Sequence, residues 1–453
     1  MQKVSFNVKR TASVIASLMV CSVLIIMVLF HHTTVVNGIN PQMDNRKSDA
    51  EFRHIRETTK EGSFIDRNGY PITYADKKGV PATIEDSYAF SPLIGYNSII
   101  YGVSGLRDKF SEHLFKGGKD STGADIKLTI DSSLQKFCYD LLDESEGSCI
   151  VLDSDTGEIL ALVSRSGTAE FDANNIDDLY STYVTIDGFF LNRATRAVDP
   201  PGSTFKIVTA TSMIENGKEN YIYEDNGFYK IGNNTYYNFD KRKFGTTDLL
   251  LAMKKSSNVY FASSGVELGS EKLYNTAKKY MYGESIELDF CTLYSNFEKS
   301  DISNPSTLAE TSFGQGTTLI SPLQLCMQIQ SIMNNEGVML KPYLIQSITN
   351  DEKTEYSGKT ETLTKATDST TAKKLYELLS ETAKDYRLYD ADSGSVIAKT
   401  GTADLYNGTN AIYITCGFTT EDTRYAICIS KRNTNETSSS LIPATNTLLE
   451  YLK

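Results

Sequence analysis

The sequence predicts an α+β fold in which helices pack on both sides of an antiparallel sheet. Strand patterns occupy residues 125–164 and 394–430, and helical patterns fill most of the chain between them. With 40% hydrophobic and 23% charged residues, the composition is that of a globular protein. A length of 453 residues is sufficient for a large core and a smaller additional module.

The first element is an apolar run at residues 12–30, nineteen residues without a charge. This is about the length that crosses the hydrocarbon core of a membrane. Lys3, Lys9 and Arg10 precede it, which places the N-terminus in the cytoplasm. The alternative is a cleaved signal peptide, but the run is long for one and no A-x-A site follows. We therefore expect residues 1–11 to be a cytoplasmic tail and residues 12–30 to be an uncleaved anchor.

A linker and a small N-terminal module are expected at residues 31–124. Residues 31–50 are polar and rich in turn formers. Asn68-Gly69 lies between apolar runs, which is a strong hairpin signal. A short amphipathic helix is expected within residues 91–117. We place the boundary with the large domain, residues 125–453, near residue 125.

The large domain begins with a strand at 125–131 and a helix at 132–145. A hairpin follows at 147–164, and a helix should start at Ser203 and end at Gly217, a residue that favours helix ends. The Thr/Ser/Lys-rich stretch 352–371 is expected to be an exposed loop. The remaining helices are predicted at 247–267, 270–281, 321–335, 371–385 and 441–453, and the remaining strands at 337–348, 394–403, 410–418 and 424–430.

Charge, histidine and cysteine content exclude several functions. The net charge is −12 and no basic stripe is present, so a nucleic-acid partner is not expected. All four histidines precede residue 114, and the seven cysteines are scattered without a CxxC. A zinc site is therefore not expected, nor any other metal or cofactor. Cys416 and Cys428 lie in neighbouring strand patterns, and whether they pair stays open.

The stretch "PPGSTFK" places Ser203 three residues before Lys206. A serine hydroxyl needs a nearby base to act as a nucleophile, and this domain has no histidine. Two residues at this spacing share one face of a helix, and lysine can be the base if burial and a second cation lower its pKa. The spacing alone is weak, because Ser133 and Lys136 repeat it on what we expect to be an exposed helix face.

Two further motifs strengthen the case. Ser256-Ser257-Asn258 falls between two amphipathic helix halves, where a solvated helix break would be the simplest explanation. Lys399-Thr400-Gly401-Thr402 ends a strand, and a glycine inside a strand marks close approach of a ligand or of another backbone. The three motifs in this order are the set found in serine β-lactamases and penicillin-binding proteins.

The chain resembles the class B penicillin-binding proteins, D,D-transpeptidases of peptidoglycan, along nearly its whole length. Ala398 departs from the glycine usual in the family, and no aromatic pair follows the KTGTA segment. The N-terminal pedestal is short for the family. The segments that carry the resemblance are the apolar anchor, "DRNG" (66–69), "LTID" (128–131), "DTGEILALVS" (155–164), "NRATRAVDPPGSTFK" (192–206), "KKSSN", "FGQGTTLISPLQL" (313–325) and "KTGTA".

The resemblance implies a role for each motif residue. Ser203 is the nucleophile and Lys206 its base. Ser256, supported by Lys399, protonates the leaving D-alanine, and Asn258 holds the substrate amide and Lys206. The backbone N–H groups of Ser203 and Thr402 would form the oxyanion hole, and the residues expected to bind the substrate and its carboxylate are Thr400, Gly401 and Thr402 with Lys399.

The resemblance also implies partners, a location and alternatives. The partners would be peptidoglycan stem peptides, β-lactam antibiotics and a polytopic membrane glycan polymerase, at a bacterial cell membrane. A class D-like β-lactamase or β-lactam sensor shares the STFK and KTG motifs but typically has valine where Asn258 stands. A class A-like hydrolase would need a glutamate near the site, and "EKLYN" (271–275) is better explained as the first turn of a helix. A non-catalytic scaffold is the third alternative.

Overall fold

The computed structural model of the chain describes residues 49–117, 121–405 and 407–453. The predicted tail, the predicted anchor at 12–30 and the start of the linker lie outside these residues. Within the described ranges, no helix has both the length and the apolar character that a membrane crossing requires. Contacts divide the chain into two units, Met1–Ile55 and Arg56–Lys453, and helix α2 (Asp49–Thr58) contains the division.

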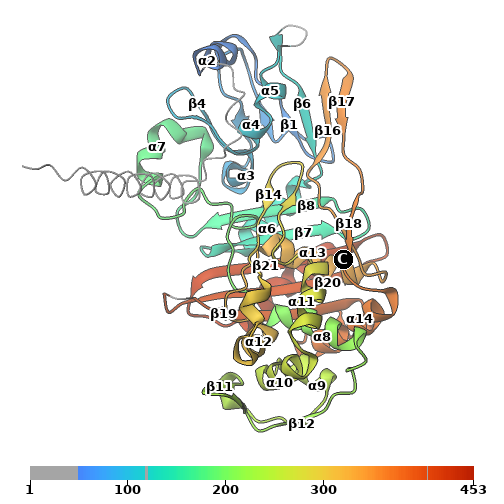
Figure 1. Ribbon diagram of the computed structural model, residues 1–453. Coiled ribbons are helices and arrows are strands. Elements are labelled where there is room, and N and C mark those ends of the chain that lie inside the picture. Colours follow the sequence, from blue (N-terminus) through green and yellow to red (C-terminus); the bar gives the residue numbers. More distant parts are fainter. Residues whose placement is uncertain (1–48, 118–120, 406) are drawn as a thin grey trace, which may run out of the picture. The chain divides into compact units, whose positions relative to one another are not determined.

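The second unit is organised around a five-stranded antiparallel sheet, with the strand order β19-β20-β21-β7-β8 (Figure 1). Strands from the two ends of the domain therefore pair in one sheet, as predicted, and β19 forms one edge. The bounds are β7 Glu146–Asp153, β8 Ile159–Ser166, β19 Val396–Asp404, β20 Asn410–Thr419 and β21 Arg424–Thr434.

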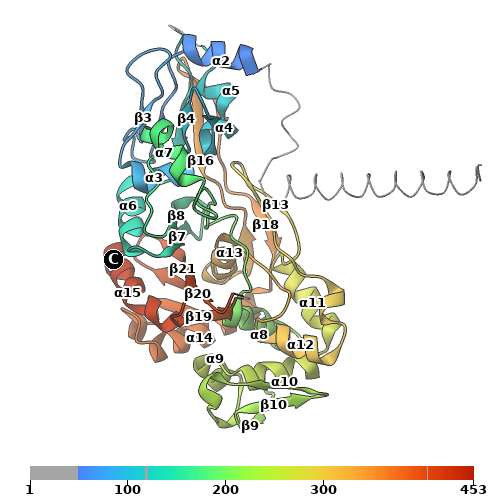
Figure 2. The same cartoon turned by 90° about the vertical axis from the view of Figure 1, so that its left-hand side faces the viewer.

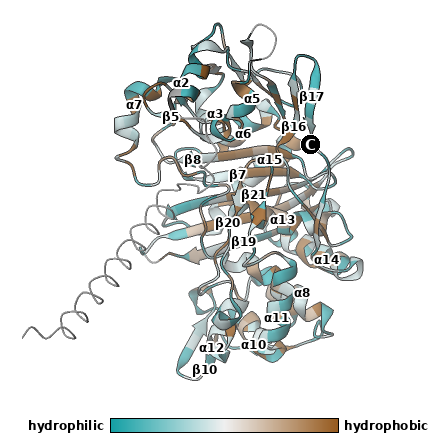
Figure 3. Ribbon diagram, turned by 45° about the horizontal axis from the view of Figure 1, so that its top comes forward, coloured by the Kyte–Doolittle hydropathy of each residue, from teal (hydrophilic) through white to brown (hydrophobic). Residues whose placement is uncertain are grey.

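Helices cover both faces of this sheet (Figure 2). Helix α13 (Pro322–Met333) packs on one face and is buried over its whole length. Helices α6 (Ser132–Leu141) and α15 (Ile442–Leu452) lie on the other face. Because both faces are covered, the inner strands are continuous apolar runs rather than alternating ones. Hydrophobic residues accordingly concentrate in the sheet and in α13 (Figure 3).

The register of the sheet shows how the two C-terminal cysteines lie. Cys416 is opposite Ile427, and Cys428 is opposite Thr415. Successive residues of a strand face opposite sides of a sheet, so the two thiols point to different faces. Both cysteines are free and buried.

A mainly helical region lies beside the β19 edge of the sheet (Figures 1 and 2). The predicted helix at 203–217 begins as a 3-10 turn, Gly202–Phe205, and becomes α-helical only at Lys206, as α8 (Lys206–Glu215). The other helices are α9 Leu249–Lys255, α10 Asn258–Leu268, α11 Ser270–Lys279, α12 Pro305–Ser312 and α14 Ser369–Asp385, and the short strands are β9 Tyr223–Asp225, β10 Phe228–Ile231, β11 Asn234–Tyr237, β12 Gly245–Thr247, β13 Ile286–Glu287 and β14 Thr292–Leu293.

The N-terminal module is tied to the large domain by a second sheet. Its order is β1-β6-β16-β17, where β17 is Lys353–Ser357, so residues far apart in the chain share it. At the predicted Asn68-Gly69 turn, the Gly69 N–H donates to the Asp66 carbonyl over 3.1 Å. The division near residue 125 stays a prediction. The elements of the module are β1 Phe64–Ile65, β2 Thr73–Tyr74, β3 Thr83–Ile84, α3 Ser87–Ile94, β4 Asn97–Ser98, β5 Gly102–Val103, α4 Gly105–Lys109 and α5 Ser111–Leu114, and the elements of the large domain that lie against it are β6 Asp125–Leu128, α7 Ile176–Tyr183 and β16 Ile345–Asn350.

The expectation of a loop at 352–371 was wrong in part. The residues are largely exposed, but β17 (Lys353–Ser357) pairs with β16, and β18 (Thr362–Lys365) pairs with β15 (Val338–Leu340). Polar composition predicts exposure, whereas strand formation here depends on the unpaired edges that β15 and β16 present.

Candidate active site

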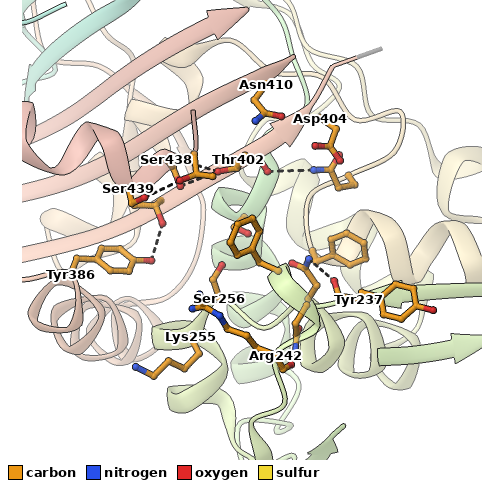
Figure 4. Close-up of a pocket in the computed structure, with 18 of the residues that line it drawn as sticks. Tyr237, Arg242, Lys255, Ser256, Tyr386, Thr402, Asp404, Asn410, Ser438 and Ser439 are labelled. Atoms are coloured by element: carbon orange, nitrogen blue, oxygen red, sulfur yellow. Dashed lines mark hydrogen bonds between the residues drawn. The ribbon is translucent and has the colours of Figure 1, made fainter. Parts of the chain in front are cut away.

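A cleft of about 670 Å³ lies between the β19 edge, the junction of α9 and α10, and the β10–β11 hairpin (Figure 4). Residues from all three predicted motifs line it, although they are separated by up to two hundred residues in the chain. The lining includes Ser203, Ser256, Asn258, Thr400 and Thr402, together with Tyr237, Phe239, Arg242, Glu310, Phe313, Gln315, Tyr386 and Asp404.

Ser203 and Lys206 meet as the spacing predicted. The Lys206 Nζ lies 2.8 Å from the Ser203 Oγ. The same nitrogen lies 2.7 Å from the Ser256 carbonyl oxygen and 2.7 Å from the Asn258 Oδ1. Lys206 is 0% exposed, whereas Ser203 is partly open to the cleft. The serine is thus accessible to a ligand while its lysine partner is shielded from water.

The surroundings of Lys206 favour the neutral amine. Burial lowers the pKa of Lys206 well below its usual value, and the nearby charge of Lys399 lowers it further. A neutral amine keeps two N–H groups and one lone pair. The N–H groups can donate to the Ser256 carbonyl and the Asn258 amide oxygen, so the lone pair is left for the Ser203 O–H. In this arrangement Lys206 can accept the Ser203 proton, which is what a serine needs in order to act as a nucleophile.

Ser256 ends α9 in the left-handed conformation, with φ of 52°. This backbone is unusual for a residue with a side chain, and such conformations concentrate at functional sites. The Ser256 Oγ lies 3.1 Å from the Lys206 Nζ and 3.0 Å from the Lys399 Nζ. The hydroxyl therefore bridges the two buried lysines.

A buried carboxylate supports this turn from behind. Asp225 accepts from the Ser257 hydroxyl over 2.6 Å and from the Asn238 amide over 2.8 Å, and it is 0% exposed. Ser257 also caps α10 by accepting from the Tyr260 N–H over 2.9 Å. Asn258 opens that helix, so the network fixes where its side chain points. Asp225 and Asn238 were not predicted from the sequence, because they carry no motif spacing.

Lys399 enters the site from β19, where it is 0% exposed. Its Nζ donates to the Ser256 Oγ, to the Thr400 carbonyl over 3.0 Å and to the Tyr386 hydroxyl over 3.1 Å. Thr402, further along the strand, bonds its hydroxyl to the Ser438 Oγ over 3.1 Å. Tyr386 and Ser438 were also missed, because only the folded chain brings them to the KTGT segment.

Gly314 and Gly401 allow their two backbone segments to approach the segment that leads to Ser203. A Cβ on Gly401 would lie 2.9 Å from the Pro201 carbonyl oxygen, and one on Gly314 would lie 1.7 Å from the Gly202 oxygen. Gly401 in the strand thus marks the close approach of another backbone segment. The sequence had predicted the close approach of either a ligand or another backbone. Gly401 itself is buried, and its predicted contact with substrate stays a prediction.

Two carboxylates line the cleft in addition to the motif residues. Glu310 comes from α12, and burial raises the pKa of its carboxyl group. Asp404 stands exposed at the end of β19. Among the described residues, no group of three histidine, cysteine or acidic side chains is placed to hold a metal ion.

The structure therefore brings the predicted residues together. Ser203, Lys206, Ser256, Asn258 and Lys399 form one continuous set of hydrogen bonds. Thr400 and Thr402 face the same cleft. Ser133 and Lys136, which share the serine–lysine spacing, lie elsewhere on α6.

Comparison with known proteins agrees with this geometry. The family described as "Penicillin binding protein transpeptidase domain" matches residues 147–450. A D,D-transpeptidase domain from Eggerthella lenta is 26% identical and superposes with a TM-score of 0.78, covering 87% of this chain and 98% of that one. Penicillin-binding protein A of Mycobacterium tuberculosis, solved as a penicillin G acyl-enzyme, is 20% identical with a TM-score of 0.79, covers 87% of this chain and 100% of that one, and shows the shared fold.

Curated relatives are similar over part of their length. The peptidoglycan D,D-transpeptidase MrdA of Acinetobacter baumannii is 29% identical over 323 residues, 65% of this chain and 46% of that protein. PbpA of Mycolicibacterium smegmatis is 26% identical over 355 residues, covering 70% of this chain and 71% of that protein. The chain thus spans about half the length of the first of these relatives and more of the second.

Proposed function

The chain belongs to the penicillin-binding protein transpeptidase family, and we propose that it is a peptidoglycan D,D-transpeptidase. It would cross-link stem peptides through an acyl-enzyme on Ser203 and would be inhibited covalently by β-lactams. The observation that carries the proposal is the buried Lys206 amine, 2.8 Å from the Ser203 Oγ and surrounded by groups that favour its neutral form.

In the first step, the Ser203 oxygen attacks the carbonyl between the two terminal D-alanines while its proton moves to the Lys206 amine. The new oxygen–carbon bond produces an oxyanion, for which the backbone N–H groups of Ser203 and Thr402 are the proposed donors. Collapse of this intermediate breaks the carbon–nitrogen bond. Ser256, which lies between Lys206 and Lys399, passes a proton to the departing D-alanine amine.

In the second step, the amine of another stem peptide attacks the ester, and its proton leaves through the same groups. The acyl group is transferred and Ser203 regains its hydroxyl. The edge strand β19 suits a peptide ligand, because one side of its backbone is not paired within the sheet. Thr400, Gly401 and Thr402 would bind the donor peptide along this edge, and Asn258 would hold its amide.

The N-terminal part is proposed to anchor the enzyme. The uncharged run at 12–30 would cross a bacterial cell membrane once, with residues 1–11 in the cytoplasm and the catalytic domain outside. Lys3, Lys9 and Arg10 support this orientation. The anchor and the module up to residue 124 would bind a polytopic membrane glycan polymerase.

The proposal is tested by labelling the purified chain with benzylpenicillin and mapping the adduct by mass spectrometry. We expect one penicilloyl group on Ser203 and no adduct in Ser203→Ala. Ser133→Ala is the matched control, since it alters the other serine–lysine pair, and it should label like the wild type. An adduct on Ser133, or labelling that survives Ser203→Ala, would reject the assignment.

A β-lactamase would share the adduct but release it quickly. Release needs a base that activates water within hydrogen-bond reach of the ester. Glu310 is the half-buried carboxylate of the cleft, so it is the residue to examine. We expect the adduct to persist for many minutes in the wild type and in Glu310→Gln alike. Rapid turnover that Glu310→Gln abolishes would show a hydrolase with Glu310 as its base.

A further inference from the structure

Tyr386 places a phenol hydroxyl at one end of the hydrogen-bonded set in the cleft. It follows directly after α14 and lines the pocket, where it is labelled in Figure 4. Its Oη lies 3.1 Å from the Lys399 Nζ and 3.1 Å from the Thr400 Oγ1. One side chain thus contacts both the cation and the first hydroxyl of the KTGT segment.

The contacts of Lys399 leave none of its three N–H groups unused. An ammonium group has three donors and no acceptor. Here the acceptors are the Ser256 Oγ, the Thr400 carbonyl and the Tyr386 Oη, at 3.0, 3.0 and 3.1 Å. The Tyr386 oxygen therefore takes one N–H and helps to direct another toward Ser256. The positive charge of Lys399 attracts a ligand anion, but its three N–H groups are already donated to the protein. A hydrogen bond to the anion must therefore come from a hydroxyl group.

The two hydroxyl groups of Tyr386 and Thr400 can supply that hydrogen bond. They carry two protons, and the single bond between them uses one. Among the described residues, neither hydroxyl has another acceptor, so one proton remains for a ligand. The Thr402 hydroxyl is different, because it accepts from the Ser438 N–H and bonds the Ser438 Oγ, both at 3.1 Å. Of the threonine hydroxyls of this strand, that of Thr400 is the better placed to serve an incoming anion.

We propose that Tyr386 is a substrate-binding residue that completes a carboxylate anchor with Thr400 and Lys399. Its oxygen holds the Lys399 ammonium, and the Tyr386–Thr400 pair donates its remaining proton to the ligand. The ligand group is the terminal carboxylate of a D-alanyl peptide or of a β-lactam, so the inference rests on the proposed function. No bond is made or broken at Tyr386.

The test compares benzylpenicillin with its methyl ester, which lacks the negative charge. Second-order acylation rate constants are measured for the full-length wild type and for Tyr386→Phe, which removes only the hydroxyl. We expect a loss of about 3-fold to 5-fold with the acid, which is below the ~10-fold scale of one hydrogen bond to a charged group because the Thr400 hydroxyl keeps a proton for the ligand. With the ester the loss should be less than about 2-fold, so the ratio of the two rate constants falls.

Two further variants make the result specific. Tyr389→Phe removes a nearby tyrosine hydroxyl that does not line the cleft, and the ratio should stay at its wild-type value. Thr400→Val should lower the ratio by a similarly small factor, and the double variant should lose more than the two single variants combined, because each single variant leaves one hydroxyl proton for the ligand and the double variant leaves none.

Other results would overturn either the role of Tyr386 or the proposed function. An unchanged ratio in Tyr386→Phe, whether the two rates stay constant or fall equally, overturns the anchor role. Additive losses in the double variant would show that the hydroxyls act separately and would overturn the shared-proton arrangement. Absence of any adduct in the wild type would instead reject the proposed function, which separates the two failures.

Discussion

The chain contains two serine–lysine pairs with the same spacing, and they lie in opposite surroundings. The Lys136 side chain is 43% exposed, and its Nζ donates to Asp86 over 2.9 Å on the surface of α6. Lys206 is 0% exposed, contacts Ser203 and has Lys399 as a neighbour. The spacing alone therefore gives no chemistry. Burial and a second cation lower the pKa of Lys206, and this is what suits it to the proposed role of base.

The largest expected effect comes from Lys206→Arg. Arginine stays protonated in proteins and cannot accept the Ser203 proton. Acylation by benzylpenicillin should fall by a factor on the order of 10³, within the range for loss of a general base. Lys136→Arg should acylate at the wild-type rate. The measurement is rapid-quench labelling with the melting temperature as a check on folding, and near-normal acylation by a folded Lys206→Arg protein would remove Lys206 as the base.

The second prediction concerns pH. Because the pKa of Lys206 is lowered, the free amine is available well below the usual lysine range. Acylation should be constant above the lowered pKa and should fall about tenfold for each unit of pH below it. Replacement of Lys136 by methionine should leave this profile in place. A rate that does not decline at acid pH while the protein stays folded would contradict a titrating base.

The third prediction concerns the support behind the motif turn. In Asp225→Ala, the Ser257 hydroxyl and the Asn238 amide lose a buried charged acceptor. We expect the free energy of unfolding to fall by about 2–4 kcal/mol, and acylation to slow because the turn that carries Asn258 loses the support that Asp225 gives to Ser257. Urea denaturation and labelling give the two values. Normal acylation would contradict the prediction, because it would show that the turn at residues 256–258 keeps its geometry without the hydrogen bonds of Asp225.

The smallest effect is expected at the exposed pair. Asp86→Ala removes the partner of Lys136, where both side chains are more than two-fifths exposed. Surface ion pairs contribute from zero to about 1 kcal/mol, and this one should lie in the lower half of that range at moderate salt. A double-mutant cycle with Lys136→Ala measures the coupling. A coupling as large as the Asp225 effect would erase the difference between the two regions.

The three motifs, in their order along the chain, predicted which residues lie together in the cleft. Both the type and the spacing of these residues are constrained by the chemistry. Ser203, Lys206, Ser256, Asn258 and Lys399 were found in this way, and the structure brings them together. The antiparallel sheet followed from long apolar runs with clear turns. The exposed strands at 353–357 and 362–365 did not, because their pairing depends on edges supplied by distant residues.

Tyr386, Asp225 and Asn238 illustrate what sequence reasoning cannot reach. Each is a common residue type that belongs to no sequence motif. Each also makes a hydrogen bond to a residue at least 13 positions away in the chain. The helix start at 203 was also placed too early. Pro201 and Gly202 lead into a tight 3-10 turn, and regular α-helical geometry begins only at Lys206.

The close packing around Ser203 limits which residues of the cleft can be replaced. A side chain at Gly314 or Gly401 would overlap the backbone that leads to Ser203, so neither glycine can be replaced without a shift of that backbone. The rim is different, because the side chains of Tyr237, Phe239 and Arg242 are exposed. Under the proposed function, variants selected by β-lactams should therefore accumulate substitutions along the rim, while the two glycines of the floor stay unchanged.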